Sequence, residues 1–427
     1  MKRFINPDKS TWKSLTKRSS ASYDSLEPLA KSIFKKVEKE GDLAIRGYTL
    51  KYDNVQLKSN IVSSDEISTA AQRIPKKLKI AIQKAKNNIE IFHKAQITST
   101  VQVETQPGVS CWQKKLPIEK VGLYIPGGSA PLFSTVLMLA VPAKIAGCNK
   151  LILCSPPDNK GMLPDVILYT ANLCGVDYIF KVGGMQAIAG MTLGTESIPK
   201  ADKIFGPGNQ FVTVAKQLAT KYQVSIDMPA GPSELMVVAD KTGNPDFIAS
   251  DLLSQAEHGP DSQVILVTNN IKIADTTFEK ISEQLENLER KVTAQKALNN
   301  SKVICFDNDK DMLEFVNLYG AEHLIVCLEN ETEFVDLIKH AGSVFIGNYT
   351  PESAGDYASG TNHTLPTNGY VRQYSGVNLD SFLKAITYQK ITANGLVDLG
   401  PVVEEMAAAE GLEAHKNAVS IRLKTLK

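Results

Sequence analysis

The sequence lacks the features that mark several large classes of protein. Lys and Arg (47) nearly equal Asp and Glu (46) among 427 residues, and no basic block is interleaved with aromatic residues. Nucleic-acid-binding proteins normally carry a basic patch, so we expect no nucleic-acid partner. The longest apolar runs, such as 136–143, are far shorter than the roughly 20 residues that span a membrane. Residues 1–20 contain no apolar stretch typical of a signal peptide. We expect a soluble, cytoplasmic protein with no membrane partner.

Cysteine is also scarce. The chain has 6 cysteines, no two of them form a CxxC pair, and several stand inside apolar segments. A buried free cysteine behaves as a small hydrophobic residue. We therefore expect reduced thiols in a reducing compartment, and neither disulfides nor a cysteine metal site.

Standard nucleotide-binding motifs are missing too. The segment 206–211, Gly-Pro-Gly-Asn-Gln-Phe, lacks the third glycine of GxGxxG, and no GxxxxGK[ST] loop occurs. Yet a predicted strand, a glycine turn and a predicted helix follow one another here and again around Gly183–Gly184. Such a turn presents backbone N–H groups to a phosphate, although an ordinary strand-to-helix turn accounts for the pattern equally well.

What the sequence does contain is a regular alternation of strand-like and helix-like segments. Residues 20–96 have apolar residues at helical spacing. Strands are predicted at 121–125, 150–154, 178–182, 203–205, 233–238, 263–267, 303–306, 323–326 and 343–346. Helices are predicted between them and again at 401–423, where Gly411 breaks the pattern. Parallel strands need helical crossovers, so this alternation predicts parallel sheets.

The predicted fold class is α/β, with two Rossmann-like parallel-sheet domains that lack the GxGxxG fingerprint and small helical segments at both ends. Gly and Pro clusters at 126–129 and 229–232 are the predicted domain junctions, because these residues favour turns. The predicted parts are an N-terminal arm (1–20), a first α/β domain (21–125 with 233–375), an inserted α/β domain (126–232) and a C-terminal helical module (376–427).

The strongest candidate for chemistry is the segment 253–260, Leu-Ser-Gln-Ala-Glu-His-Gly-Pro, which ends a predicted helix. Gln255 and His258 are three residues apart and share one helix face. A His nitrogen is a common zinc ligand, and a Gln oxygen is a harder, less common one. The pair predicts two metal ligands, with a His that bonds the last helical carbonyls as the open alternative.

A second candidate pair, Glu322 and His323, stands directly before the apolar run 324–326. A Glu and a His at the lip of a strand can move protons near neutral pH. A capping Glu beside a hydrogen-bonded His is the structural alternative.

Polar segments nearer the C-terminus supply further candidates. Asp356 in the long polar stretch 342–367 predicts a carboxylate ligand, and His363 either binds metal or closes a turn with Asn362. Glu410 and His415 flank Gly411, and an exposed helix is the default interpretation of that segment.

Together these stretches resemble the histidinol dehydrogenase family. Seven strings match in the same order and cover the chain from about residue 110 onward, whereas the first hundred residues match only in general character. Phe211 stands where the family often has Tyr. The matching strings are 121–128 (VGLYIPGG), 206–209 (GPGN), 230–234 (AGPSE), 253–259 (LSQAEHG), 321–324 (AEHL), 355–357 (GDY) and 410–415 (EGLEAH).

The resemblance implies cofactors, substrate and partner. One zinc ion per subunit would be bound by Gln255, His258, Asp356 and His415. NAD would contact Tyr124, Gln186 and Asn209 in the inserted domain and its glycine turns. The substrate, L-histidinol, would contact the metal ligands and Ser233, His323 and Glu410. The C-terminal module, with Glu410 and His415, would complete the site of the partner subunit in an intertwined homodimer.

The resemblance also implies a reaction, the last two oxidations of histidine biosynthesis. His323 would take the alcohol proton while a hydride leaves to NAD, and Glu322 would activate water for the second oxidation, from bound L-histidinaldehyde to L-histidine. Three rival interpretations remain: a zinc hydrolase, a related zinc and NAD dehydrogenase acting on another small alcohol, and a non-catalytic α/β binding protein. The hydrolase leaves Tyr124 and Asn209 unexplained, and the binding protein has no use for Glu322 beside His323.

Overall fold

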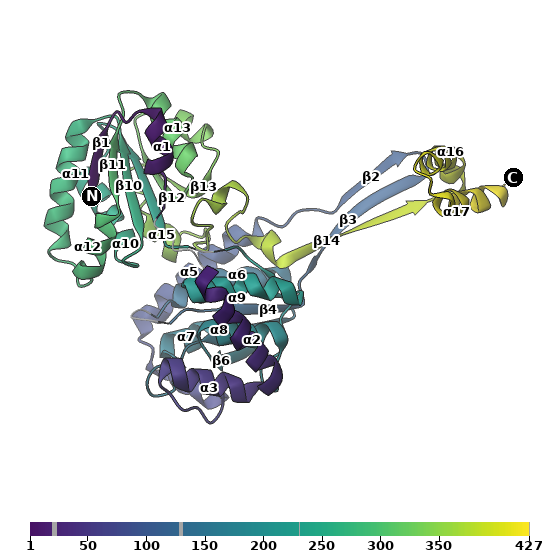
Figure 1. The fold of residues 1–427 in the computed structure, drawn as a ribbon, viewed down its shortest axis with the longest axis horizontal. Helices are drawn as coiled ribbons and strands as arrows, with labels where there is room; N and C mark the ends of the chain where they lie inside the picture. The colour runs from purple at the N-terminus through teal and green to yellow at the C-terminus, as the bar shows by residue number, and fades with distance from the viewer. Residues whose placement is uncertain (19–23, 128–130, 230, 427) are drawn as a thin grey trace. The chain divides into compact units, whose positions relative to one another are not determined.

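The computed structural model describes residues 1–18, 24–127, 131–229 and 231–426. Residues 19 and 20 of the predicted arm, and Gly128 and Ala230 of the matching strings, lie outside these ranges. The chain divides into two compact units: the first contains residues 1–96 and 118–381, the second residues 97–117 and 382–427. Figure 1 shows the elements of both units.

The first unit contains a six-stranded parallel sheet with helices on both faces (Figure 1). In spatial order its strands are β1 (Lys2–Ile5), β11 (Lys302–Cys305), β10 (Gln263–Thr268), β9 (Glu234–Ala239), β12 (Ala321–Cys327) and β13 (Ala341–Ile346). Every residue of β9, β10 and β12 is buried. This explains why these strands appear in the sequence as unbroken apolar runs.

Helices cover the six-stranded sheet on each side. The face that contains Leu235 and Val237 packs on α10 (Pro245–Ala256), α11 (Ile271–Leu285) and α12 (Lys291–Asn299). The face that contains Met236 and Val238 packs on α1 (Lys9–Leu15), α13 (Asp309–Tyr319) and α14 (Glu331–Asp336). Successive residues of one strand therefore enter two different cores, as a buried parallel strand requires.

The first unit also contains a five-stranded parallel sheet. In spatial order its strands are β6 (Tyr178–Lys181), β5 (Lys150–Ser155), β4 (Lys120–Tyr124), β7 (Lys203–Phe205) and β8 (Ser225–Ile226). We expected 121–125 at the end of the first α/β domain, but β4 pairs with β5 and β7 in this sheet. The chain leaves β4 toward β5 on one side and later returns to β7 on the other.

The N-terminal helices pack around the five-stranded sheet. One of its faces packs on α2 (Glu27–Glu40), α3 (Asp42–Asp53), α8 (Gly184–Leu193) and α9 (Gln210–Ala219). Helix α6 (Phe133–Ala146) packs on β4 and is flanked by α5 (Lys76–Lys94) and α7 (Asp165–Leu173). Helix α4 (Ser64–Arg73) in turn packs on α7. The helical region 20–96 was expected, but it packs here and not on the six-stranded sheet: α2 and α3 pack on α8 and α9, and α4 and α5 pack on α7 and α6.

The second unit differs from the purely helical module predicted at 376–427. Its strand β14 (Leu383–Ile391) pairs antiparallel with β3 (Val109–Pro117), which also pairs with β2 (Val101–Gln106). Two helices follow, α16 (Ala393–Ala409) and α17 (Glu413–Lys424). No strand was predicted at β14, because none of its residues is buried and so no apolar alternation marks it in the sequence.

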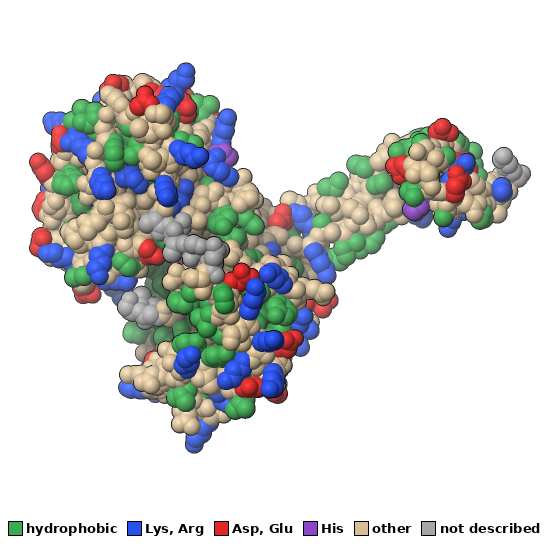
Figure 2. Space-filling view, in the orientation of Figure 1, with side chains coloured by type: hydrophobic (Ala, Val, Ile, Leu, Met, Phe, Trp, Pro, Cys, Tyr) green, Lys and Arg blue, Asp and Glu red, His purple; other side chains and the backbone are tan. Residues whose placement is uncertain are grey.

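The segment predicted as an N-terminal arm (1–20) contributes β1 to the six-stranded sheet and α1 to its core. The α/β fold class with two parallel sheets is confirmed. All six cysteines are free thiols, and five of them are buried. Within the described residues, no helix combines the length and apolar character needed to cross a membrane. On the face shown in Figure 2, cationic and anionic side chains of the first unit are interspersed, in keeping with the nearly balanced charge.

Candidate active site

Glu322 and His323 are the second and third residues of β12, and both are buried, with exposed fractions of 7% and 3%. They lie at the amino end of the strand, whereas open α/β sheets usually bind ligands at the carboxyl ends. Oε2 of Glu322 accepts a hydrogen bond of 2.8 Å from the backbone N–H of Glu234 on β9. Nδ1 of the His323 ring lies 3.1 Å from the carbonyl oxygen of Glu234. Neighbouring strands thus fix both side chains.

The charges around this pair shift both pKa values. Burial raises the pKa of the Glu322 carboxyl to about 8, although His323 and the backbone N–H of Glu234 act in the opposite direction. Burial alone would lower the pKa of His323, but Glu322, Glu352 and Asp356 together raise it to about 10. Three carboxyl groups thus surround one imidazole, an arrangement that suits a bound cation.

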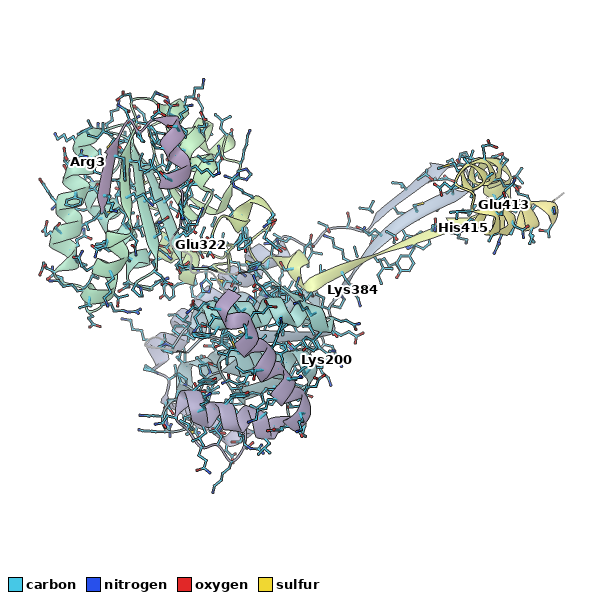
Figure 3. All side chains as sticks on the ribbon, in the orientation of Figure 1. Arg3, Lys200, Glu322, Lys384, Glu413 and His415 are labelled. Atoms are coloured by element: carbon cyan, nitrogen blue, oxygen red, sulfur yellow. The ribbon has the colours of Figure 1, made fainter. Side chains whose placement is uncertain are left out.

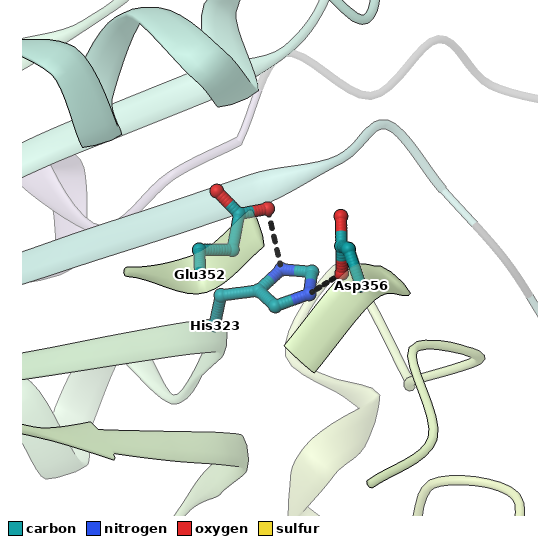
Figure 4. Close-up of side chains that lie close together, drawn as sticks. All are labelled: His323, Glu352 and Asp356. Atoms are coloured by element: carbon teal, nitrogen blue, oxygen red, sulfur yellow. Dashed lines mark ion pairs between the residues drawn. The ribbon is translucent and has the colours of Figure 1, made fainter. Parts of the chain in front are cut away.

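Helix α15 (Glu352–Tyr357) brings two of these carboxylates to His323 (Figure 4). Glu352 and Asp356 are four residues apart and so share one face of the helix. Oε1 of Glu352 lies 3.8 Å from Nδ1 of His323, and Oδ1 of Asp356 lies 3.4 Å from Nε2. The ligand atoms of the three residues all lie within 4.8 Å of one another, a spacing that a metal ion could bridge.

The end of α10 contributes the predicted pair Gln255 and His258. The helix ends at Ala256, and the N–H of His258 bonds the carbonyl oxygen of Gln255 in the following turn. The side-chain amide of Gln255 lies 3.4 Å from Nδ1 of His258. Burial lowers the pKa of His258, and Asp356 is near enough to oppose that shift. Gln255, His258 and Asp356 are thus brought into one neighbourhood, as expected of metal ligands.

His363 contacts the backbone of Asp356 and helix α6. Its Nδ1 lies 2.8 Å from the carbonyl oxygen of Asp356, and its Nε2 lies 3.2 Å from Oγ1 of Thr135 on α6. Both ring nitrogens are therefore engaged, and neither contacts Asn362. Asn362 instead donates to the carbonyl oxygen of Met138. His363 ties the loop after α15 to the helices of the five-stranded sheet.

Ser233 opens onto a cavity of about 130 Å³, which is also lined by Glu322 and by the glycine turn with Gly206 and Gly208. Ser233 directly precedes β9, so the predicted substrate residue and the predicted catalytic Glu322 share one space with that turn. The turn is held by Asp227, which accepts from the N–H of Gly206 at 2.8 Å and forms a buried ion pair with Lys216.

A second cavity, of about 580 Å³, lies at the carboxyl ends of β4 and β5 and is lined by Tyr124, Gly184 and Asn209. The strand order reverses between β4 and β7, and such a switch point is the usual dinucleotide site of an open α/β sheet. The hydroxyl of Tyr124 accepts from the N–H of Gly184 at 3.0 Å. Asn209 caps α9 through its side-chain oxygen, which leaves its amide nitrogen for a ligand.

Gln186, the third predicted NAD contact, is buried on α8 with its side chain against Gly184, and it is not among the residues that line this cavity. Asp53, the last residue of α3, does line it, although no site was predicted there. Oδ2 of Asp53 is buried without a hydrogen-bond partner among the described residues, and burial raises the pKa of its carboxyl to about 6. No motif marks Asp53, because it comes from a helix outside the strand-turn-helix pattern.

A substitution at Gly206 tests the role of the glycine turn that contains Gly206 and Gly208. The φ of 132° at Gly206 strains any L side chain, and an added Cβ would collide with the carbonyl oxygen of Tyr124. We expect Gly206→Ala to lower the free energy of unfolding by about 1–3 kcal/mol. We also expect it to weaken the NAD binding that the family resemblance implies, because the turn must shift. Chemical denaturation and NAD titration calorimetry measure the two effects. Gly47→Ala is the control, since an added Cβ there meets nothing within 4 Å. Unchanged stability and NAD affinity in Gly206→Ala would refute the assigned role.

Glu410 and His415 belong to the second unit, at the end of α16 and on α17. Figure 3 labels His415 and Glu413 on that unit and Glu322 on the first. The described contacts of the first unit therefore supply only part of the expected ligand set. The role of Glu410 and His415 in the site of a partner subunit remains a prediction.

A divalent metal ion fits the residues of the first unit. Nε2 of His323 and Oδ1 of Asp356 face each other, both atoms are buried, and neither makes a hydrogen bond. Native proteins rarely leave two such atoms without partners unless a water or an ion satisfies them. The available donors are imidazole nitrogens, a carboxylate oxygen and an amide oxygen, a set that zinc accepts.

Glu352 is the chemically important residue that was not predicted from the sequence. It lies within a stretch interpreted as a polar loop, yet its exposed fraction is 1%. Its spacing of four residues from Asp356 is the signal that would have placed both carboxylates on one face of a short helix.

Comparisons with known proteins bear on what this arrangement does. A profile of the histidinol dehydrogenase family matches residues 16–423. Histidinol dehydrogenase of Bacteroides thetaiotaomicron is 55% identical over 427 residues, 100% of both chains. That of Vibrio parahaemolyticus is 54% identical over 396 residues, which are 92% of this chain and 91% of the relative.

A solved structure agrees with the sequence relatives. The crystal structure of histidinol dehydrogenase from Elizabethkingia anophelis matches with a TM-score of 0.98 and 54% identity, and the match covers 100% of this chain and 98% of that one. The resemblance first drawn from seven short motifs is thereby confirmed. The chain, with its two parallel sheets and its buried cluster of His and carboxylate side chains, belongs to the histidinol dehydrogenase family of oxidoreductases.

Proposed function

We propose that the protein oxidises L-histidinol to L-histidine in two NAD-dependent steps, through bound L-histidinaldehyde, as a cytoplasmic zinc enzyme of histidine biosynthesis. The observation that carries this proposal is the joint position of Ser233, Glu322 and the glycine turn around one cavity. A candidate metal cluster and a candidate dinucleotide cavity belong to the same unit. Neither a hydrolase nor a simple binding protein needs this combination.

Binding and orientation follow from the charges of the site. The substrate's ammonium group suits the carboxyl groups that surround His323, above all Asp356, whose pKa His323 lowers against the effect of burial. Zinc, when bound by Gln255, His258, Asp356 and a partner's His415, would act as a template that fixes the substrate's nitrogen atoms. Ser233 and a partner's Glu410 would contact the rest of the substrate.

Proton movement is assigned to the two residues of β12. His323 takes the alcohol proton as a hydride leaves to the nicotinamide of NAD. This role needs a neutral imidazole, whereas the surrounding carboxylates raise the pKa of His323 to about 10. A zinc ion held in part by Asp356 would offset part of that effect. Glu322 then takes a proton from the water that hydrates the aldehyde, and a second hydride leaves to a second NAD.

The dinucleotide is assigned to the cavity at the carboxyl ends of β4 and β5, where Tyr124 and Asn209 are exposed to it. The positive end of the α9 dipole after the glycine turn would favour the pyrophosphate. The N–H groups of Phe211 and Val212 at this end already bond the side-chain oxygen of Asn209. Gln186 would hold the backbone at Gly184 in place, since its side chain packs against that residue. We further propose a homodimer in which each site is completed by the second unit of the partner.

The decisive experiment counts the NADH formed per L-histidinol consumed by zinc-loaded protein. We expect two NADH per substrate, loss of activity after chelation, and recovery when zinc is restored. One NADH per substrate, or turnover of another small alcohol only, would replace the proposal with a related dehydrogenase of different substrate. Turnover without any NADH would favour the hydrolase.

A further inference from the structure

Glu352 makes contacts that set it apart from the other carboxylates of the site. Its exposed fraction is 1%, and Oγ of Ser254 donates to its Oε2 at 3.1 Å. The amide of Gln255 faces both of its carboxylate oxygens. Glu352 is therefore hydrogen-bonded to the last turn of α10, which precedes His258.

This carboxylate determines which way the Gln255 amide points. With its nitrogen toward Glu352, the amide donates to both carboxylate oxygens, at 3.2 Å for Oε2. With its oxygen toward Glu352, an acceptor would face two acceptors in a buried place. In its carboxylate form Glu352 accepts hydrogen bonds only, so the first orientation is the stable one for that form. Burial raises the pKa of this carboxyl, and the neighbouring His323 opposes the rise.

The orientation has a consequence for the other end of the amide. The amide atom that faces His258 is then the oxygen, and it lies 3.4 Å from Nδ1 of that residue. Two atoms bound to one tetrahedral ion at about 2 Å each lie about 3.3 Å apart. The Gln255 oxygen and the His258 nitrogen are thus spaced as two ligands of a single ion.

The oxygens of Glu352 differ from those of Asp356 in one respect. Ser254 and Gln255 donate hydrogen bonds to Glu352, whereas Oδ1 of Asp356 is buried and makes no hydrogen bond, with Nε2 of His323 at 3.4 Å as its ion-pair neighbour. A metal ion would have to displace existing hydrogen bonds at Glu352 but would satisfy an open oxygen at Asp356. This distinction assigns the ligand position to Asp356, although Glu352 also lies close to His323.

We propose that Glu352 is a positioning residue that turns the Gln255 amide so that its oxygen, and not its nitrogen, faces the metal ion. This inference rests on the proposed zinc site and gives a role to a residue outside the proposed ligands Gln255, His258, Asp356 and His415. The carboxylate acts through Gln255, as outer residues of metal sites commonly act through the ligands that they orient. Loss of its charge removes the preference between the two amide orientations.

The test is zinc affinity, measured by competition with a chromogenic chelator, which does not depend on activity. We expect Glu352→Gln to bind zinc about 10–100-fold more weakly than the unchanged protein. Ser254→Ala, which removes only one hydrogen bond to the same carboxylate, should weaken zinc binding less. Thermal unfolding of the metal-free variants checks that each one folds, and a folded Glu352→Gln with unchanged zinc affinity would overturn the proposal.

The cobalt-substituted protein separates a positioning role from direct ligation. Because Glu352 is not a ligand, the visible absorption bands of bound Co²⁺ should keep their positions and intensities in cobalt-saturated Glu352→Gln. A change to the spectrum of a different coordination number would show that Glu352 itself binds the ion and would overturn the assignment. If the unchanged protein binds no zinc at all, the proposed function fails, and that outcome is distinct from either result on the variant.

Discussion

Glu322→Gln should leave the first oxidation of L-histidinol largely intact and slow the second by about 10²–10⁴-fold, the usual contribution of a general base. The amide has the shape of the carboxylate and can still accept the 2.8 Å hydrogen bond from the N–H of Glu234. It cannot accept a proton from water. Rapid-mixing measurements should show one NADH per site at nearly the original rate, followed by accumulation of aldehyde that a semicarbazide trap captures.

The pH dependence of the second step gives an independent view of the same residue. Burial raises the pKa of Glu322 to about 8, so the carboxylate becomes a competent base as the pH rises through that value. The rate of the second oxidation should therefore increase as the pH rises through that pKa in the unchanged protein, and this increase should be absent from Glu322→Gln. Glu279→Gln, at an exposed position of α11, is the matched control. Equal loss of both oxidations would count against the assignment.

Two inactive variants should restore activity to each other when they are produced together. His258→Asn removes a ligand of the first unit, and His415→Asn removes one of the second, so every site of each pure variant lacks a zinc ligand. If sites are shared between subunits, a mixed dimer has one site with both defects and one with neither. With half of the dimers mixed, about a quarter of the full activity should return, as two-fold symmetry requires.

The control for this experiment places both substitutions on one chain. Coproduced with unchanged chains, His258→Asn/His415→Asn forms mixed dimers in which each site carries one defect, so those dimers should be inactive. Mass measurement of the purified mixture verifies that mixed dimers form. If they form and the two single variants recover nothing, the two units do not combine across subunits.

The parallel sheets could be predicted because their strands are buried on both faces. Strands such as Glu234–Ala239 and Gln263–Thr268 are nearly unbroken apolar runs followed by helical periodicity, and this pattern is typical of a parallel sheet covered by helices. The three-stranded sheet could not be predicted in the same way. Every residue of Val101–Gln106 is exposed or half-buried, and β14 is similar, so neither strand has an apolar face to detect.

The candidate site was only partly accessible from the sequence for a related reason. Gln255 and His258 are three residues apart, so helical geometry alone brings them together. Glu322 and His323 are adjacent in sequence, and although successive strand residues point to opposite faces, Oε2 of Glu322 lies 3.6 Å from Nδ1 of His323. That Asp356 joins them depends on the packing of α15 against α10. Asp53 reaches its cavity through the packing of α3 on α8. Contacts between distant segments leave no local pattern, and only the resemblance linked Asp356 to the others.

The edge strand β1 sets a constraint on the order in which the protein is made and folds. Lys2 pairs with Lys302, so one strand of that pair is synthesised three hundred residues before the other. At about 5–20 residues per second, translation leaves Lys2 waiting about 15–60 s for its partner. All strands of the five-stranded sheet, from Lys120 to Ile226, leave the ribosome earlier than β11. The five-stranded sheet of the nascent chain can therefore fold first, and the six-stranded sheet with Glu322 and His323 is completed only after β11 to β13 have been synthesised.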